Sequence, residues 1–246
     1  MSTRSSRPSV AELRAATQPP AIFERNSGEH WAGRLYVRRV SPFLTKRLLG
    51  VPPNAITALM IPVGVGAGAV LAVHCRVWPA IVAFVLIQLQ ILLDCTDGEI
   101  ARWQGKSSVV GIYLDRIAHW VTETALPIGL GYGIGHVELG LVAAVLQLLI
   151  KGEAALVAVA RLEAGLPKVA DRADVVAPRP SLLRGARRLA GRAPFYRLFV
   201  AVEFTIVTLI CAIADVRHEL LIALVVAGAV TAALRLVAIL TSDRLR

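Results

Sequence analysis

Long apolar runs, separated by short polar segments, fill most of the chain after residue 50. Each run is close to the ~20 residues that an α-helix needs to cross the hydrocarbon core of a bilayer. The six runs cover residues 54–75, 78–101, 109–133, 137–163, 195–214 and 218–241. This pattern predicts an all-α polytopic membrane protein whose six transmembrane helices form one domain over residues 50–241. Closely spaced glycines at Gly64, Gly66 and Gly68 either allow close helix packing in lipid or carry no specific signal.

The composition agrees with a membrane protein. Hydrophobic residues make up 56% of the 246 residues, charged residues only 18%, and the mean hydropathy is +0.63. An ordinary soluble domain of this length carries more charge. The three cysteines, Cys75, Cys95 and Cys211, form no CxxC pair, so neither a disulfide framework nor a zinc site is expected.

The positive charge of the chain, +10 at pH 7, is concentrated between the apolar runs. Residues 1–53, 102–108, 161–197 and 242–246 hold nine, two, nine and two of the 27 lysines and arginines. The segments on the other side of the membrane would hold only Arg76 and Arg217. By the positive-inside rule, we expect both termini in the cytoplasm and the chain in the cell (inner) membrane. This distribution also favours a membrane surface over nucleic acid as the partner.

The N-terminal 49 residues divide into two segments. Residues 31–49 combine arginine and lysine with tryptophan, leucine, tyrosine and phenylalanine. This mixture predicts an amphipathic interfacial helix, interrupted at Pro42, that binds anionic lipid headgroups. Residues 1–30, rich in serine, arginine and proline, are expected to form a disordered cytoplasmic tail, and residues 242–246 a short cytoplasmic C-terminus.

Ionisable residues interrupt the apolar pattern between the second and third runs. Asp94 and Asp97 are three residues apart, and Asp115 and His119 are four apart, so each pair shares one face of its helix. If the two helices pack as a hairpin, the four side chains converge. Ionisable groups in a membrane span are costly and point to a function. Clustered carboxylates need a cation between them, and oxygen ligands favour Mg²⁺ or Mn²⁺.

Small residues and an arginine accompany these carboxylates. Gly98, Ala101 and Gly111 leave room for a bulky ligand against the helix backbone. Arg102 can form a forked contact with a phosphate. Together these residues favour a site for a metal-bound phosphate diester, in which two ions would stabilise the attacking and leaving oxygens. The alternative is an ion-pair network that only holds the helix hairpin together.

The stretch "DCTDGEIARWQGKSSVVGIYLDRIAHW", residues 94–120, resembles the signature of the CDP-alcohol phosphotransferases (CDP-alcohol phosphatidyltransferases), D-x2-D-G-x2-A-R-x8-G-x3-D-x3-D. The matching residues are Asp94, Asp97, Gly98, Ala101, Arg102, Gly111 and Asp115. The last position departs from the signature, because His119 replaces the aspartate. The resemblance covers about residues 31–241 and includes "PNAIT" at Pro53–Thr57.

This resemblance implies an integral membrane enzyme, often a homodimer. Such an enzyme moves a phosphatidyl or other substituted phosphate group from a CDP-linked donor to an alcohol or sugar-phosphate acceptor. CDP-diacylglycerol is the expected donor, CMP is released, and the product enters phospholipid biosynthesis. Two Mg²⁺ or Mn²⁺ ions are the implied cofactors, held by Asp94, Asp97 and Asp115. The nucleotide would be bound by Asn54, Thr57, Gly98, Ala101, Arg102, Ser108 and Gly111.

His119 would inherit the position of a residue that is both a metal ligand and the base acting on the acceptor hydroxyl. An imidazole can serve in either role, since its unperturbed pKa is about 6.5 and its nitrogens bind metals. It lacks the negative charge of aspartate, so the second ion would be held less tightly. Glu123, four residues on, either accepts the other ring N–H of His119 or pairs with Lys151.

Arg161, at the end of the fourth run, is a candidate for binding an anionic acceptor. Its alternative role is to extend to the membrane interface. In the phosphatidylinositol-phosphate synthases of this family, a lysine precedes the matching arginine by two positions. Here that position is Val159, which argues against an inositol-phosphate acceptor.

Two other interpretations of the sequence are a catalytically silent protein that binds nucleotide and metal, and a transporter. A transporter would carry its polar residues at the depth of the membrane midplane, whereas the acidic residues here lie at one end of their helices.

Overall fold

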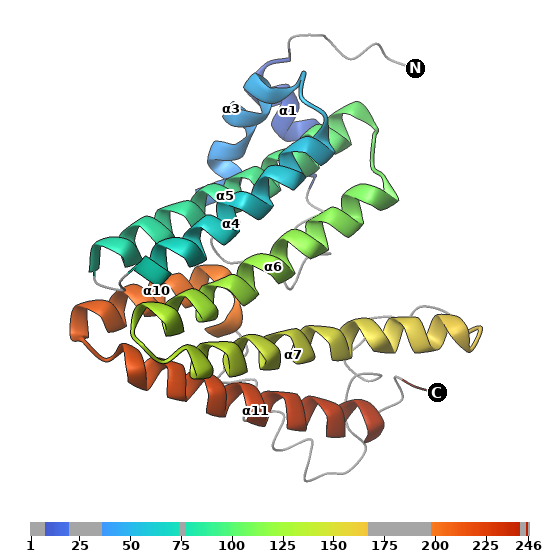
Figure 1. Ribbon diagram of the computed structural model, residues 1–246. Helices are drawn as coiled ribbons and strands as arrows, with labels where there is room; N and C mark the ends of the chain where they lie inside the picture. Colours follow the sequence, from blue (N-terminus) through green and yellow to red (C-terminus); the bar gives the residue numbers. More distant parts are fainter. Residues whose placement is uncertain (1–7, 20–35, 74–76, 167–197, 242–244, 246) are drawn as a thin grey trace.

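The computed structural model describes residues 8–19, 36–73, 77–166, 198–241 and 245, and within these segments the chain forms helices and no strand (Figure 1). Five helices are long: α4 (Pro53–Val73), α5 (Val77–Gln104), α6 (Val109–Gly133), α7 (Val137–Glu163) and α11 (Arg217–Thr241). Three are shorter: α1 (Val10–Thr17), α3 (Arg38–Leu48) and α10 (Ala201–Ala214). The predicted all-α class is confirmed for this part of the chain.

The helices α4, α5, α6 and α7 run in alternating directions, so the end of α5 lies beside the start of α6 and of α4 (Figure 1). The helix α6 packs between α4 and α7, α11 packs on α7, and α10 packs on α5. This arrangement brings the two halves of the signature stretch to the same end of the bundle, and α4 packs on both α5 and α6.

Four of the described helices, α4, α5, α7 and α11, are long and apolar enough to cross a membrane. The predicted number of six spans is not confirmed. The helix α6 is long enough, but Asp115, Arg116 and Glu123 lower its hydropathy. The helix α10 is apolar but has only 14 residues, and the expected start of this span at residues 195–197 lies outside the described residues.

The helices α4 and α6 cross in direct backbone contact. A Cβ atom added at Gly129 would lie 2.0 Å from the Gly68 carbonyl oxygen, and one added at Gly68 would lie 2.6 Å from the Ala125 carbonyl oxygen. One turn earlier, a Cβ at Gly64 would overlap the side chain of Thr122. Small residues spaced by four therefore determine how closely the two helices approach, as in other helix pairs in membranes.

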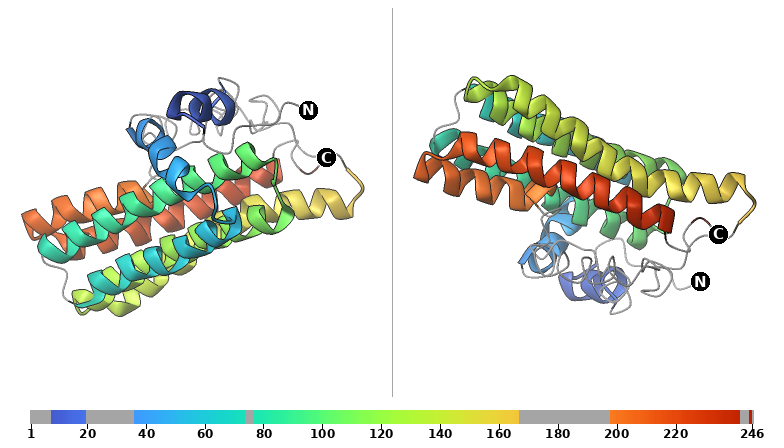
Figure 2. Two further views of the ribbon diagram at one scale, coloured as in Figure 1. Left: turned by 90° about the horizontal axis from the view of Figure 1, so that it is seen from above. Right: turned by 90° about the horizontal axis from the view of Figure 1, so that it is seen from below.

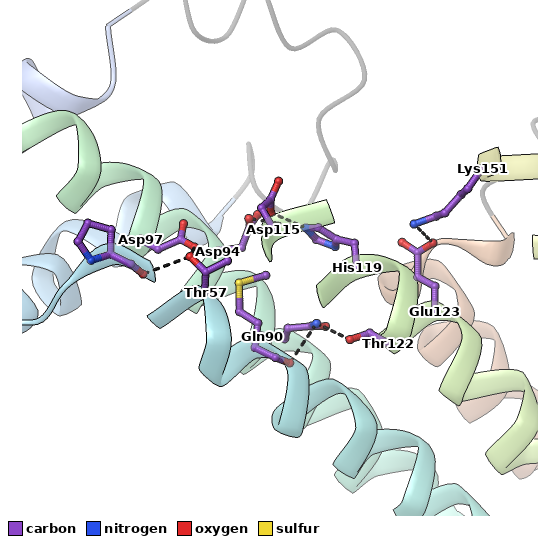
Figure 3. A network of polar contacts seen from close by, with 11 residues as sticks. Thr57, Gln90, Asp94, Asp97, Asp115, His119, Thr122, Glu123 and Lys151 are labelled. Atoms are coloured by element: carbon purple, nitrogen blue, oxygen red, sulfur yellow. Dashed lines mark hydrogen bonds and ion pairs between the residues drawn. The ribbon is translucent and has the colours of Figure 1, made fainter. Parts of the chain in front are cut away.

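A buried glutamine joins α5 to this helix pair. The Gln90 side-chain amide donates to Thr122 Oγ1 of α6 at 2.6 Å and to the Met60 carbonyl oxygen of α4 at 3.3 Å (Figure 3). Gln90 and Thr122 are both almost fully buried. Because no water competes for these donors, the hydrogen bonds fix the rotation of α5 against its two neighbours.

The two N-terminal helices lie together on one side of the bundle and pack on α5 (Figure 2). The helix α1 falls in the segment that we expected to be disordered. It is stabilised by a capping box between Ser9 and Glu12 and by burial of Leu13. The rest of the expected tail, residues 1–7 and 20–30, and residues 242–244 and 246 lie outside the described residues.

The helix α3 lies within the segment predicted to be an amphipathic interfacial helix; residues 31–35 of that segment are not described. Its buried side is polar at Ser41 and Thr45, whereas Val40 and Phe43 are exposed. An outward apolar surface beside exposed basic residues suits contact with a lipid interface.

Gly129→Ala is expected to destabilise the protein by about 1–3 kcal/mol, the usual cost of overpacking. The added methyl group would collide with the Gly68 carbonyl, and neither backbone can move without separating α4 from α6. The measurement is thermal unfolding of the purified protein in detergent. Gly66→Ala is the matched control, because nothing lies within 4 Å of a Cβ at that position. Equal melting temperatures for the two variants would contradict the crossing described above.

Candidate functional site

A tight turn brings the end of α5 to the start of α6. Gly105 adopts a positive φ of 64°, and the Lys106 N–H donates to the Ala101 carbonyl oxygen at 2.9 Å, which closes the last turn of α5. Three residues later, the Ser108 side chain accepts a hydrogen bond from the Gly111 N–H at 3.0 Å and caps α6. The signature residues on both helices therefore sit at the same end of the bundle.

Three of the four predicted metal ligands meet across this hairpin. One potential ligand atom from each of Asp94, Asp115 and His119 lies within 4.8 Å of the other two. His119 Nε2 is 3.4 Å from Asp115 Oδ1 and 3.6 Å from Asp94 Oδ1 (Figure 3). We refer to these three residues as the hairpin cluster.

The fourth predicted ligand, Asp97, lies beside the hairpin cluster but is not part of it. Its carboxylate accepts a hydrogen bond from the Thr57 hydroxyl of α4, which is also 3.1 Å from the Pro53 carbonyl oxygen (Figure 3). Asp97 is buried, with 8% of its surface exposed. Thr57, expected near the nucleotide, therefore contacts a predicted metal ligand.

The donor set of the hairpin cluster fits a divalent cation. The Asp115 Oδ1 atom is buried and has no hydrogen-bond donor. It lies 3.4 Å from His119 Nε2 and near the second carboxylate, so a cation bound among the three groups would pair with it. Carboxylate oxygens suit Mg²⁺ and Mn²⁺, and an imidazole nitrogen can complete the set.

The residues predicted to bind nucleotide fall into two groups. In the first, Asn54 Oδ1 of α4 lies 3.5 Å from Ser108 Oγ, and a Cβ added at Gly111 would be 2.9 Å from the same Asn54 oxygen. Gly111 thus allows the start of α4 to approach the start of α6.

The second group lies on the last turns of α5. A Cβ at Gly98 would be 3.1 Å from Arg102 Nη1, so the guanidinium group itself occupies the space above this glycine. The Arg102 Nε–H donates to the Thr17 carbonyl oxygen of α1 at 2.7 Å. Ala101 is half-buried between these residues. We had expected Gly98 to leave room for a ligand, and the structure places the guanidinium group of Arg102 against it.

Glu123 is paired with α7 rather than with His119. Its Oε2 atom lies 2.7 Å from Lys151 Nζ (Figure 3) and accepts a second hydrogen bond from the Gln147 side chain. Of the two roles expected for Glu123, the structure therefore supports the ion pair with Lys151. Gln147 was not predicted, because its place opposite Glu123 depends on how α7 is rotated against α6.

Arg161, the predicted acceptor-binding residue, lies in the last turn of α7, which contributes nothing to the hairpin cluster. Only 9% of its surface is exposed. This burial does not match an arginine that extends into the membrane interface.

Sequence reasoning also missed Glu99, which lies inside the signature stretch at a variable position. It is fully buried and accepts hydrogen bonds from residues of the two N-terminal helices. Its position could have indicated a role, because Glu99 is a charged residue in a mostly apolar helix and lies on the opposite side of that helix from Asp94 and Asp97.

Four apolar helices of membrane-spanning length are typical of a membrane protein, and the carboxylate and imidazole cluster could hold a metal ion. The chain belongs to the CDP-alcohol phosphatidyltransferase family, whose sequence model matches residues 51–230. Members of this family are transferases of phosphate-containing groups from CDP-alcohols and generally depend on divalent metals. The match contains the hairpin cluster, whereas α1 and α3 lie outside it. No curated protein matches the chain.

Mn²⁺ is expected to raise the melting temperature of the wild-type protein, and Asp115→Asn is expected to remove most of this increase. A ligand present at about 100 times its Kd stabilises a protein by about 2.7 kcal/mol. Glu153→Gln is the control, because it removes another buried carboxylate, one that lies 3.5 Å from Arg235 Nε on the far helices α7 and α11. The same Mn²⁺-induced shift in wild type and Asp115→Asn would exclude the hairpin cluster as the binding site.

Proposed function

We propose that the chain is an integral membrane transferase that moves a phosphatidyl group from CDP-diacylglycerol to an alcohol acceptor and releases CMP, as a step in phospholipid biosynthesis. It would cross the cell (inner) membrane six times, with both termini and the site on the cytoplasmic side. The observation that carries this proposal is the meeting of Asp94, Asp115 and His119 within 4.8 Å at the signature hairpin of the matched family region.

Asp94, Asp97 and Asp115 would hold the divalent ions, Mg²⁺ or Mn²⁺. When bound, these ions would supply positive charge at the diphosphate and at the attacking and leaving oxygens. Asn54, Ser108 and Gly111 would line the nucleotide at the start of α6. Arg102 would neutralise charge on the diphosphate of the donor and, to the same extent, on the departing CMP, since a guanidinium group matches the geometry of a phosphate.

In the chemical step, the hydroxyl oxygen of the acceptor forms a bond to the β-phosphorus of the donor, the phosphorus joined to the lipid. The bond between this phosphorus and the oxygen that bridges the two phosphates breaks, and CMP leaves with that oxygen. The hydroxyl proton passes to His119 Nε2. The carboxylates of Asp94 and Asp115, 3.6 and 3.4 Å away, would stabilise the imidazolium that forms.

The two roles expected for His119 compete for one atom. Nε2 is the ring nitrogen that faces both carboxylates, and a nitrogen whose lone pair binds a metal cannot also take a proton. A carboxylate avoids this conflict, because one oxygen can bind the ion while the other accepts the proton. We therefore assign the base role to His119 and the metal to the aspartates.

The acceptor, an alcohol or a sugar phosphate, would reach the site from the side of α7, where Arg161 can pair with an anionic group. The homodimer implied by the family resemblance stays a prediction. The second candidate function is a catalytically silent protein that binds nucleotide and metal. The contacts of His119 with Asp94 and Asp115 favour this second function. If the imidazole were permanently protonated, the three side chains would form an ion-pair network.

Purified protein is expected to release CMP from CDP-diacylglycerol when supplied with Mg²⁺ or Mn²⁺ and an acceptor from a panel of alcohols and sugar phosphates. His119→Asn should lower kcat by about 10²–10⁴-fold, the usual contribution of a general base. The same variant should keep the Mn²⁺-induced rise in melting temperature. Loss of both turnover and the Mn²⁺ response would instead make His119 a metal ligand.

His119→Asp separates the remaining possibilities. A large gain in turnover would mean that the histidine impairs a site built for aspartate, and a loss would mean that the site is organised around the imidazole. No CMP release by the wild-type protein with any donor and acceptor pair, despite measurable nucleotide binding, would favour the silent protein.

A further inference from the structure

The buried carboxylate of Glu99 joins α5 to both N-terminal helices. Its Oε1 atom accepts a hydrogen bond from Gln18 Nε2 at 2.7 Å and another from the Ser41 hydroxyl, and its Oε2 atom accepts one from Thr45 Oγ1 at 2.6 Å. Glu99 is 0% exposed. A buried carboxylate is costly unless its oxygens are hydrogen-bonded, so these donors are needed for Glu99 to be buried.

The donors come from two segments that lie outside the matched family region. Gln18 directly follows α1, and Ser41 and Thr45 lie one turn apart on α3. Gln18 also donates to the Arg38 carbonyl oxygen at 2.9 Å, which joins α1 to α3. The helices α1 and α3 are therefore held on α5 as one unit.

The same end of α1 contacts the signature arginine. The Arg102 Nε–H donates to the carbonyl oxygen of Thr17, the residue before Gln18. The last carbonyl groups of a helix lack partners within the helix and carry partial negative charge, so they attract a guanidinium group. Two consecutive residues at the end of α1, Thr17 and the following Gln18, thus contact Arg102 and Glu99, which are one turn apart on α5.

These contacts restrict where Arg102 can place its charge. The Nε–H group is directed to α1, and the Nη1 atom lies over Gly98, next to Asp97. The two Nη nitrogens carry the other four N–H groups of the guanidinium, the ones suited to a forked phosphate contact. Without the Thr17 carbonyl, Arg102 would have more rotamers available, and ordering its side chain on a ligand would cost more free energy.

We propose that α1 is a positioning element for Arg102. The hydrogen bond between Gln18 and Glu99 fixes the end of α1, and the Thr17 carbonyl then orients the guanidinium group toward the diphosphate of a CDP-linked substrate. This inference rests on the proposed function, because it assumes that Arg102 contacts that diphosphate. Gln18 and Glu99 are positioning residues, since neither would touch the substrate.

The test uses the full-length protein with Gln18→Ala, which removes the donor to Glu99 from a half-buried position. We expect KM for CDP-diacylglycerol to rise about 5–20-fold while kcat changes less than twofold, as expected when ground-state and transition-state binding are lost equally. Gln104→Ala is the matched control. It removes a 2.7 Å hydrogen bond from α5 to the Leu49 carbonyl oxygen at the same end of the bundle, without touching α1, and should leave KM unchanged.

A double-mutant cycle distinguishes positioning from a general structural role. In an Arg102→Ala background, Gln18→Ala should change KM no further, because the group that it positions is gone. Equal effects of Gln18→Ala in both backgrounds would overturn the proposal, and so would an unchanged KM in the single variant.

Equilibrium binding of CDP in the presence of Mn²⁺, measured without acceptor, provides a readout that does not need turnover. If the wild-type protein binds CDP but releases no CMP from any donor, the proposed function fails. The inference is then still decided by the Kd values for CDP of the wild type, Gln18→Ala, Arg102→Ala and the double variant. If turnover is normal and the Kd values show no coupling between Gln18 and Arg102, the inference alone fails. A wild-type protein that does not bind CDP at all would overturn the inference, since Arg102 would then have no diphosphate to contact.

Discussion

The structure depends on how acidic side chains are compensated inside an apolar helix bundle. A buried carboxylate without a partner costs several kcal/mol, so each one must be hydrogen-bonded, paired with a cation or bound to a metal. Two of the acids in the described part of the chain are compensated by the protein itself. Glu123 pairs with Lys151 on the neighbouring helix, and Glu99 accepts hydrogen bonds from the N-terminal helices. Neither would gain from an added cation.

Asp94 and Asp115 differ from those acids. Both lie beside His119 Nε2, at 3.6 and 3.4 Å, and this one nitrogen can donate at most one proton. The Asp115 Oδ1 atom has no hydrogen-bond donor, although it is buried. The three groups of the hairpin cluster lie within 4.8 Å of one another and together form a donor set that a divalent cation can use.

The spacing of residues in the sequence is enough to predict the hairpin cluster, because it depends on local geometry. Intervals of three and four residues place side chains on one helix face, and a short turn brings the end of α5 to the start of α6. Spacing could not predict the partner of Asp97, and it could not decide between His119 and Lys151 as the partner of Glu123. Thr57 reaches Asp97 from α4, and Lys151 reaches Glu123 from α7, so both contacts depend on helix rotations that tertiary packing decides. The helix α1 was missed because its stability comes mainly from burial on α5 and not from a long periodic pattern.

Two parts of the chain therefore position the site residues: the long helices hold the carboxylates, and the short helix α1 contacts Arg102. The backbone contact between Gly68 and Gly129 fixes the long helices against each other and, through them, the carboxylates. Arg102, in contrast, is oriented by a carbonyl group of a short helix that the family match does not include. A change in this short helix would alter the orientation of Arg102 without altering the contact between Gly68 and Gly129, provided that Glu99 keeps its hydrogen-bond donors. Differences in how strongly such enzymes hold a CDP-linked donor can thus arise outside the signature, while the groups that perform the transfer stay unchanged.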